Sequence, residues 1–158
     1  MKRMRFFSSR CDIHTFDCTG EFAVPKTIAA RTTFHHKCIG PFNPALGGTA
    51  DFLSWSDVVR LLGNSRVAHL KMDIEGSEFG VFEEMLHSPQ DMLPAQISVE
   101  LHLPRLTLWE RTTLSVNLLH QLMRKLRSIG YVFVDRNDKK DRGGYTELLI
   151  VHRKQCCA

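Results

Sequence analysis

The stretch "HLKMDIEGSE", residues 69–78, joins an apolar run to three closely spaced carboxylates. Asp73, Glu75 and Glu78 lie within six residues, and Gly76 stands among them. A glycine lets the backbone turn sharply or come close to a ligand. Carboxylates at such a place either line a ligand site or only benefit from the dipole of the helix that follows. For Glu78 we expect the second role, that of a helix-start charge.

The segments around this stretch alternate between strand and helix patterns. The predicted order is strand 11–17, helix 24–31, strand 32–40, helix 54–63, strand 67–74, helix 77–86, strand 95–103 and helix 112–129. "YVFVDRN" and "YTELLIVHR" then form a predicted terminal hairpin. Such alternation indicates an α/β fold with a mostly parallel sheet and a C-terminal antiparallel hairpin.

The composition is that of an ordinary globular protein. The chain has 158 residues, enough for one domain, of which 43% are hydrophobic and 24% charged. A net charge of +4 is mildly basic, and no basic stripe interleaved with aromatic residues points to nucleic acid. No apolar run approaches the ~18 residues of a membrane span. We therefore expect no nucleic-acid partner, no membrane partner and a cytoplasmic location.

The cysteines show no metal-binding pattern. There are five of them, Cys11, Cys18, Cys38, Cys156 and Cys157, and no C-x-x-C spacing occurs. We therefore expect no structural zinc site and predict no bound metal. An odd number of cysteines without such spacing is typical of reduced thiols in an intracellular protein.

Polar residues stand at the carboxyl ends of three predicted parallel strands. These are Asp17 at the end of the first strand, Asp73 near the end of the third with Glu75 just after it, and Glu100 and His102 near the end of the fourth. Such ends meet at one rim of a parallel sheet, where ligands bind. Glu100 and His102, with Asp73, suit either a base with its orienting acid or a metal site. Asp17 suits either a ribose contact or a plain turn.

The segment "LKMDIEGSEFGVFEEML", residues 70–86, resembles the Lys-x-Asp-x-Glu-Gly-x-Glu segment of the FkbM-like and methyltransferase-like-24-type families. These are class I S-adenosylmethionine-dependent methyltransferases. "IHTFDCT", "FHHKCIG" and "ISVELH" resemble their second, third and fifth strands, and the hairpin resembles their sixth and seventh. The resemblance covers roughly residues 11–152 and implies a Rossmann-like methyltransferase sheet.

The resemblance also implies roles for individual residues. Asp17 would hold the ribose of S-adenosylmethionine, Ile39 and Gly40 would lie near its adenine, and Asp73 would lie near its methionine end. On the acceptor side, the resemblance places Glu75, Glu100 and His102. Glu100 or His102 would be the base if the acceptor must lose a proton. The acceptor would be a small molecule or a sugar.

The chain departs from this family before Asp17. No strand followed by a Gly-rich loop precedes that residue, so we expect a basic tail at 1–10, a partial methyltransferase domain at 11–152 and a tail at 153–158. The missing first strand would lie between the strands that begin near 11 and 67, leaving two edges open to self-association. We expect a truncated form, weak or inactive as it stands, rather than a degenerate relative.

Two other functions remain open from the sequence. The chain could be a non-catalytic α/β remnant that acts as an interaction module. It could also be a metal-dependent hydrolase that uses Asp73, Glu75, Glu100 and His102.

Overall fold

The computed structural model describes most of the chain. The described residues are 11–20, 22–41, 51–64, 66–102, 108–137 and 145–154, with the backbone alone for 108–115. The predicted N-terminal tail at 1–10, the turn of the predicted hairpin at 138–144, and Cys156 and Cys157 lie outside them.

The described strands form three sheets instead of one. They are a parallel pair of β1 (Ile13–Phe16) and β2 (Thr32–His35), a parallel pair of β3 (Cys38–Ile39) and β4 (Phe52–Leu53), and a sheet of β5 (His69–Met72), β6 (Gln96–His102), β8 (Tyr145–His152) and β7 (Tyr131–Asn137) in that spatial order. The α/β class predicted from the sequence is confirmed. A single continuous sheet is not what the described strands form.

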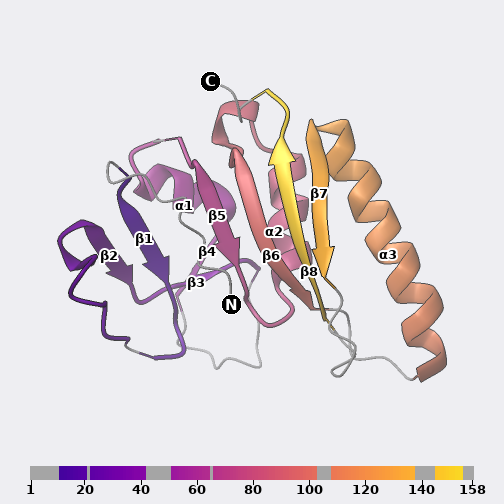
Figure 1. Ribbon diagram of the computed structural model, residues 1–158, viewed down its shortest axis with the longest axis horizontal. Coiled ribbons are helices and arrows are strands. Elements are labelled where there is room, and N and C mark those ends of the chain that lie inside the picture. The colour runs from indigo at the N-terminus through magenta and orange to yellow at the C-terminus, as the bar shows by residue number, and fades with distance from the viewer. Residues whose placement is uncertain are drawn as a thin grey trace.

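The strand directions explain where polar residues can gather. β5 and β6 are parallel, while β8 is antiparallel to both β6 and β7, as the predicted C-terminal hairpin requires. Figure 1 shows β1, β2, β5 and β6 running in one common direction, so their carboxyl ends face the same side of the molecule. Among the described residues, β1 pairs only with β2 and β5 only with β6. Self-association through these edges stays a prediction.

Three of the four predicted helices are present as α-helices. They are α1 (Trp55–Leu61), α2 (Glu78–Leu86) and α3 (Leu108–Ser128), with short 3-10 helices at Ala29–Arg31 and Gln90–Met92. Ser54 caps α1 through a reciprocal capping box with Asp57. Within the predicted helix at 24–31, only the 3-10 turn Ala29–Arg31 forms. The predicted strand at 32–40 is split into β2 and β3. None of the described helices has the length and apolar character that a membrane crossing requires.

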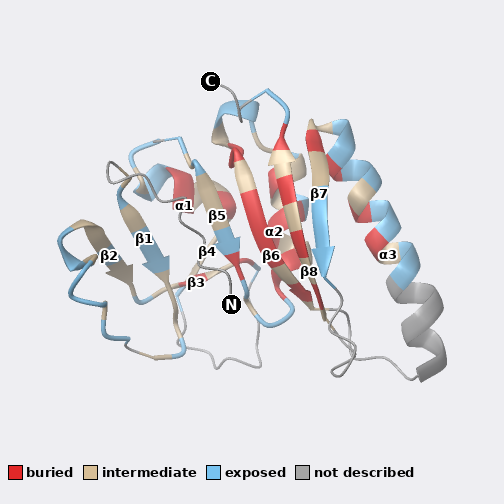
Figure 2. Cartoon of the chain, in the orientation of Figure 1, coloured by how far each residue is buried: buried red, intermediate tan, exposed pale blue. Residues whose placement is uncertain are grey.

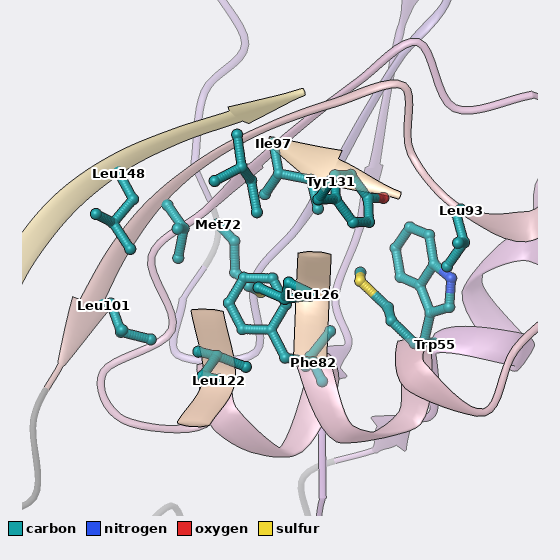
Figure 3. Packing of buried hydrophobic residues seen from close by; sticks show 14 of the residues in the cluster. Trp55, Met72, Phe82, Leu93, Ile97, Leu101, Leu122, Leu126, Tyr131 and Leu148 are labelled. Carbon is teal, nitrogen blue, oxygen red and sulfur yellow. The ribbon is translucent and has the colours of Figure 1, made fainter. Parts of the chain in front are cut away.

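One face of the four-stranded sheet carries the hydrophobic core (Figure 2). Ile97 and Leu101 alternate with more exposed residues along β6, and Phe82 of α2, Leu126 of α3 and Trp55 of α1 pack against them (Figure 3). All five side chains are at most 1% exposed. The core therefore fixes β5, β6 and α2 relative to one another, and β5 and α2 flank the acidic turn that follows Met72.

Two buried polar groups anchor the segment that leads into β6. Trp55 Nε1 donates a hydrogen bond to the carbonyl of Met92 at 3.0 Å, and the Tyr131 hydroxyl donates to the carbonyl of Pro94 at 2.7 Å. Burial raises the pKa of Tyr131. Each ring thus fills the core while its polar atom satisfies a backbone carbonyl.

We predict that Tyr131→Phe lowers the free energy of unfolding by about 1–3 kcal/mol, because the buried Pro94 carbonyl loses its partner. Urea unfolding followed by circular dichroism measures this loss. Tyr145→Phe is the matched control, since it removes the same hydroxyl from a half-buried ring, and we expect it to cost less. Equal losses for the two variants would contradict the prediction.

Candidate functional site

The turn after β5 has an unusual backbone. Glu75 has a φ of 53° and Gly76 a φ of 109°, so two consecutive residues adopt the left-handed region. Glycine tolerates this region, whereas a residue with a Cβ pays a conformational cost of roughly 1–2 kcal/mol. Such strain at a non-glycine residue persists where the surrounding structure enforces it, and functional sites are enriched in it.

Glu78, the first residue of α2, enforces this turn from inside the protein. Its side chain is fully buried, at 0% exposure. Its carboxylate accepts the backbone N–H of Ile74 at 3.0 Å and that of Gly76 at 3.1 Å. It also lies 3.4 Å from the backbone nitrogen of His102, which donates to it. The expectation that Glu78 is only a helix-start charge is therefore wrong, because an exposed charge beside the dipole would make none of these contacts.

His102, at the end of β6, brings the predicted acceptor-side residues together. Its Nδ1 lies 2.9 Å from Glu78 Oε1. On the other side of the ring, Nε2 lies 3.5 Å from Glu75 Oε2 and 3.6 Å from Glu100 Oε1. The ring of Tyr145 on β8 lies at 5.8 Å between centroids. Glu75, Glu100 and His102 thus form one cluster, as their places at the strand ends predict, and Glu78 joins it from α2.

The surroundings of His102 act on its pKa in opposite directions. Burial of the ring lowers the pKa, while the hydrogen bond and the charge of Glu78, followed by the charges of Glu75 and Asp73, raise it. The balance is a pKa above the ordinary value for histidine. The imidazolium form is therefore favoured by the carboxylates that face it.

Asp73 and two members of the cluster also bring possible cation ligands together. Asp73, Glu75 and His102 each offer one atom, and these atoms lie within 4.8 Å of one another. Carboxylate oxygens and an imidazole nitrogen suit several divalent cations. Glu100, which the hydrolase hypothesis includes, lies outside this set of described residues. Lys71 Nζ lies 3.9 Å from Asp73 Oδ2, so a positive charge already faces one of the three.

Asp17 lies at the end of β1, in a different sheet from this cluster. Its Oδ1 accepts the backbone N–H of Thr19 at 2.8 Å and the Thr19 hydroxyl at 2.7 Å. These bonds close a local turn of the kind that aspartate favours. The turn role that the sequence left open for Asp17 is therefore present, and its ribose contact stays a prediction.

Ile39 is the last residue of β3, and Gly40 directly follows it. A disulfide joins Cys18, next to Asp17, to Cys38 at the start of β3. A Cβ on Gly40 would lie 3.3 Å from Ser77 Cβ, so this glycine permits close approach to the start of α2. Ile39 packs against the core. Gly40 thus lies beside the start of α2, and the contact of Ile39 and Gly40 with a cofactor stays a prediction.

The disulfide contradicts the expectation that these cysteines are reduced thiols. Cys18 and Cys38 are bonded, and Cys11 is a free thiol among the described cysteines. Stable disulfides are typical of oxidising compartments. The pairing of Cys18 with Cys38 therefore removes the support that the cysteines gave to a cytoplasmic location. The spacing between Cys18 and Cys38 matches no local motif, so sequence reasoning had no signal for their pairing.

Comparison with known protein families gives a match that covers this cluster. The sequence model of the family described as Methyltransferase FkbM domain matches residues 53–133. Asp73, Glu75, Glu78, Glu100 and His102 all lie inside the matched segment. The comparisons with curated proteins and with solved structures yield no match.

We predict that, at position 75, a glycine variant is more stable to unfolding than an alanine variant, the reverse of the usual order. Glu75→Gly should have a free energy of unfolding about 1 kcal/mol above that of Glu75→Ala, because the left-handed region strains a residue with a Cβ and does not strain glycine. Glu83, exposed within α2, is the control, and there glycine should be about 1 kcal/mol less stable than alanine. Urea unfolding of the four variants measures both differences. The same order at both positions would contradict the strained turn.

We also predict opposite pKa shifts for two histidines of the four-stranded sheet. His102 should titrate above the ordinary value of about 6.5, and His69, whose pKa burial and Lys71 lower, should titrate below it. NMR of the ring protons measures both, with His102→Gln and His69→Gln for assignment. Because the folded pKa of His102 is raised, its stabilising effect is complete below the unfolded value and is lost as the pH rises through the folded one. Coincident midpoints would contradict the cluster's charge balance.

Proposed function

We propose, since this chain belongs to the methyltransferase FkbM domain family, that it transfers a methyl group from S-adenosylmethionine to a small polar acceptor. The observation that carries the proposal is the position of the cluster within the matched segment. Residues 53–133 contain β5, the acidic turn, α2 and β6, and the side chains of these elements meet around His102. The family match thus falls on the elements that build a polar site.

We also propose that the strands belong to a Rossmann-like methyltransferase sheet. In it, β1 and β2 would be the second and third strands of the methyltransferase sheet, and β5 and β6 the fourth and fifth. The shared direction of these four strands agrees with this assignment (Figure 1). So does the antiparallel pair of β7 and β8 at the edge of the sheet. Ligands of such sheets bind beyond the carboxyl ends of the parallel strands, where the cluster lies.

The chemistry of the cluster suits the cationic end of S-adenosylmethionine. When bound, this cofactor supplies a methyl group that is already activated on a positively charged sulfur. Asp73 and Glu75 are exposed carboxylates at the end of β5, and they would attract the sulfonium and the ammonium group of the methionine end. Asp17 would hold the ribose, with Ile39 and Gly40 on the adenine side. The chain's own task would be to position the two reactants.

His102 is the proposed general base for an acceptor hydroxyl. In its neutral form with hydrogen on Nδ1, its Nε2 would take the proton that the acceptor oxygen loses as it bonds to the methyl carbon. Glu75 and Glu100, near Nε2, would orient the acceptor and stabilise the imidazolium that forms. Their acceptor oxygens suit hydroxyl groups, so a sugar or another hydroxylated small molecule fits this side best.

The proposal is tested by equilibrium dialysis of the full chain against methyl-labelled S-adenosylmethionine. We predict saturable binding that Asp73→Asn weakens about tenfold, as the loss of one charge-assisted contact implies. Asp91→Asn, at an exposed position of the 3-10 helix Gln90–Met92, is the matched control and should bind as the wild type does. Absence of saturable binding up to about 1 mM cofactor, or equal binding by both variants, would overturn the proposal.

A further inference from the structure

We propose that Glu78 is the positioning residue of this site: its buried carboxylate holds His102 by Nδ1, so that Nε2 is the nitrogen presented to the acceptor. This inference rests on the proposed function only for the role of Nε2 as base. The geometry of the pair stands apart from it. Glu78 is a positioning residue because it acts through His102.

Burial makes the orientation of Glu78 specific. A carboxylate removed from water is costly unless its oxygens are compensated by hydrogen bonds. At 0% exposure, Glu78 receives two such bonds from the turn, through Ile74 and Gly76, and one from the backbone of His102. The fourth partner is His102 Nδ1. These three backbone hydrogen bonds hold the carboxylate in place independently of its contact with the imidazole ring.

The pairing also determines which ring nitrogen carries hydrogen. An ionised carboxylate only accepts hydrogen bonds, so Nδ1 must be the donor at 2.9 Å from Glu78 Oε1. In the neutral ring, Nε2 then keeps its lone pair. The carboxylates of Glu75 and Glu100 lie 3.5 and 3.6 Å from Nε2, farther than an ordinary hydrogen bond. The lone pair therefore points toward the part of the cluster where an acceptor would sit.

Among the described residues, the charged and titratable groups around His102 come from several elements. They are Glu78 from α2, Asp73 and Glu75 from the turn after β5, Glu100 from its own strand and Tyr145 from β8. Of these, Glu78 makes the short contact with Nδ1, and the others lie on the Nε2 side or act at longer range. Removing Glu78 should therefore free the ring to carry hydrogen on either nitrogen.

The experiment reads the hydrogen position directly by NMR of ring nitrogens in the full chain labelled with ¹⁵N-histidine. At a pH at which the ring is neutral, we expect wild-type His102 to show a protonated Nδ1 and a bare Nε2. Glu78→Gln should give a mixture of the two neutral forms. Glu84→Gln is the matched control, because Glu84 lies on the same helix and accepts the backbone N–H of Trp55 instead. It should leave the His102 signals unchanged.

Two outcomes would overturn the inference. One is a wild-type spectrum with hydrogen on Nε2, which decides the matter even if Glu78→Gln does not fold. The other is an unchanged His102 spectrum in a folded Glu78→Gln variant. Neither outcome depends on cofactor binding. Failure of the dialysis experiment would instead remove the proposed methyl transfer and leave the Glu78–His102 pair as a structural unit.

Discussion

The buried carboxylate of Glu78 is the constraint on which the polar end of this structure depends. It ties the turn after β5 to the last residue of β6, two segments that are separated along the chain by the whole of α2. Without an acceptor at this place, the backbone N–H groups of Ile74 and Gly76 would lose the buried oxygen to which they donate. The same contact sets the conformation that exposes Glu75 and the orientation of His102. One side chain therefore contributes both to the fold of the turn and to the geometry of the site.

The core gives this contact its rigidity. Trp55 and Phe82 hold α1 and α2 against the sheet, and their hydrophobic surroundings leave α2 little freedom to slide along β6. Because Glu78 begins α2, the packing of the rest of the helix positions its carboxylate beside His102. A polar site supported in this way is more precise than one built on loops alone.

The sequence predicted those parts of the fold that depend on neighbouring residues. The helix of α1 was predictable from Ser54 and Gly63, and the strand, turn and helix around Gly76 from periodicity and the glycine. The gathering of Glu75, Glu100 and His102 followed from the rule that parallel strands end at one rim. The same local patterns also placed the C-terminal antiparallel pair correctly.

What the sequence could not predict depends on contacts between distant residues. Glu78 looked like an exposed helix-start acid because its burial is set by a histidine 24 residues away. The break between β2 and β3 and the separation of the strands into three sheets depend on which strands meet in space, and periodicity carries no such information. One local signal does exist, because Glu78 follows Gly76 by two residues, a distance at which a carboxylate can reach back to a turn N–H.

The Cys18–Cys38 bond closes a loop around a segment rich in cleavage points for trypsin-like proteases. Lys26, Arg31 and Lys37 all lie between the two bonded cysteines. A single cut after any of them would leave both fragments covalently joined, and only a reductant would separate them. The integrity of the N-terminal strand pair after a proteolytic nick thus depends on the oxidation state of two sulfur atoms.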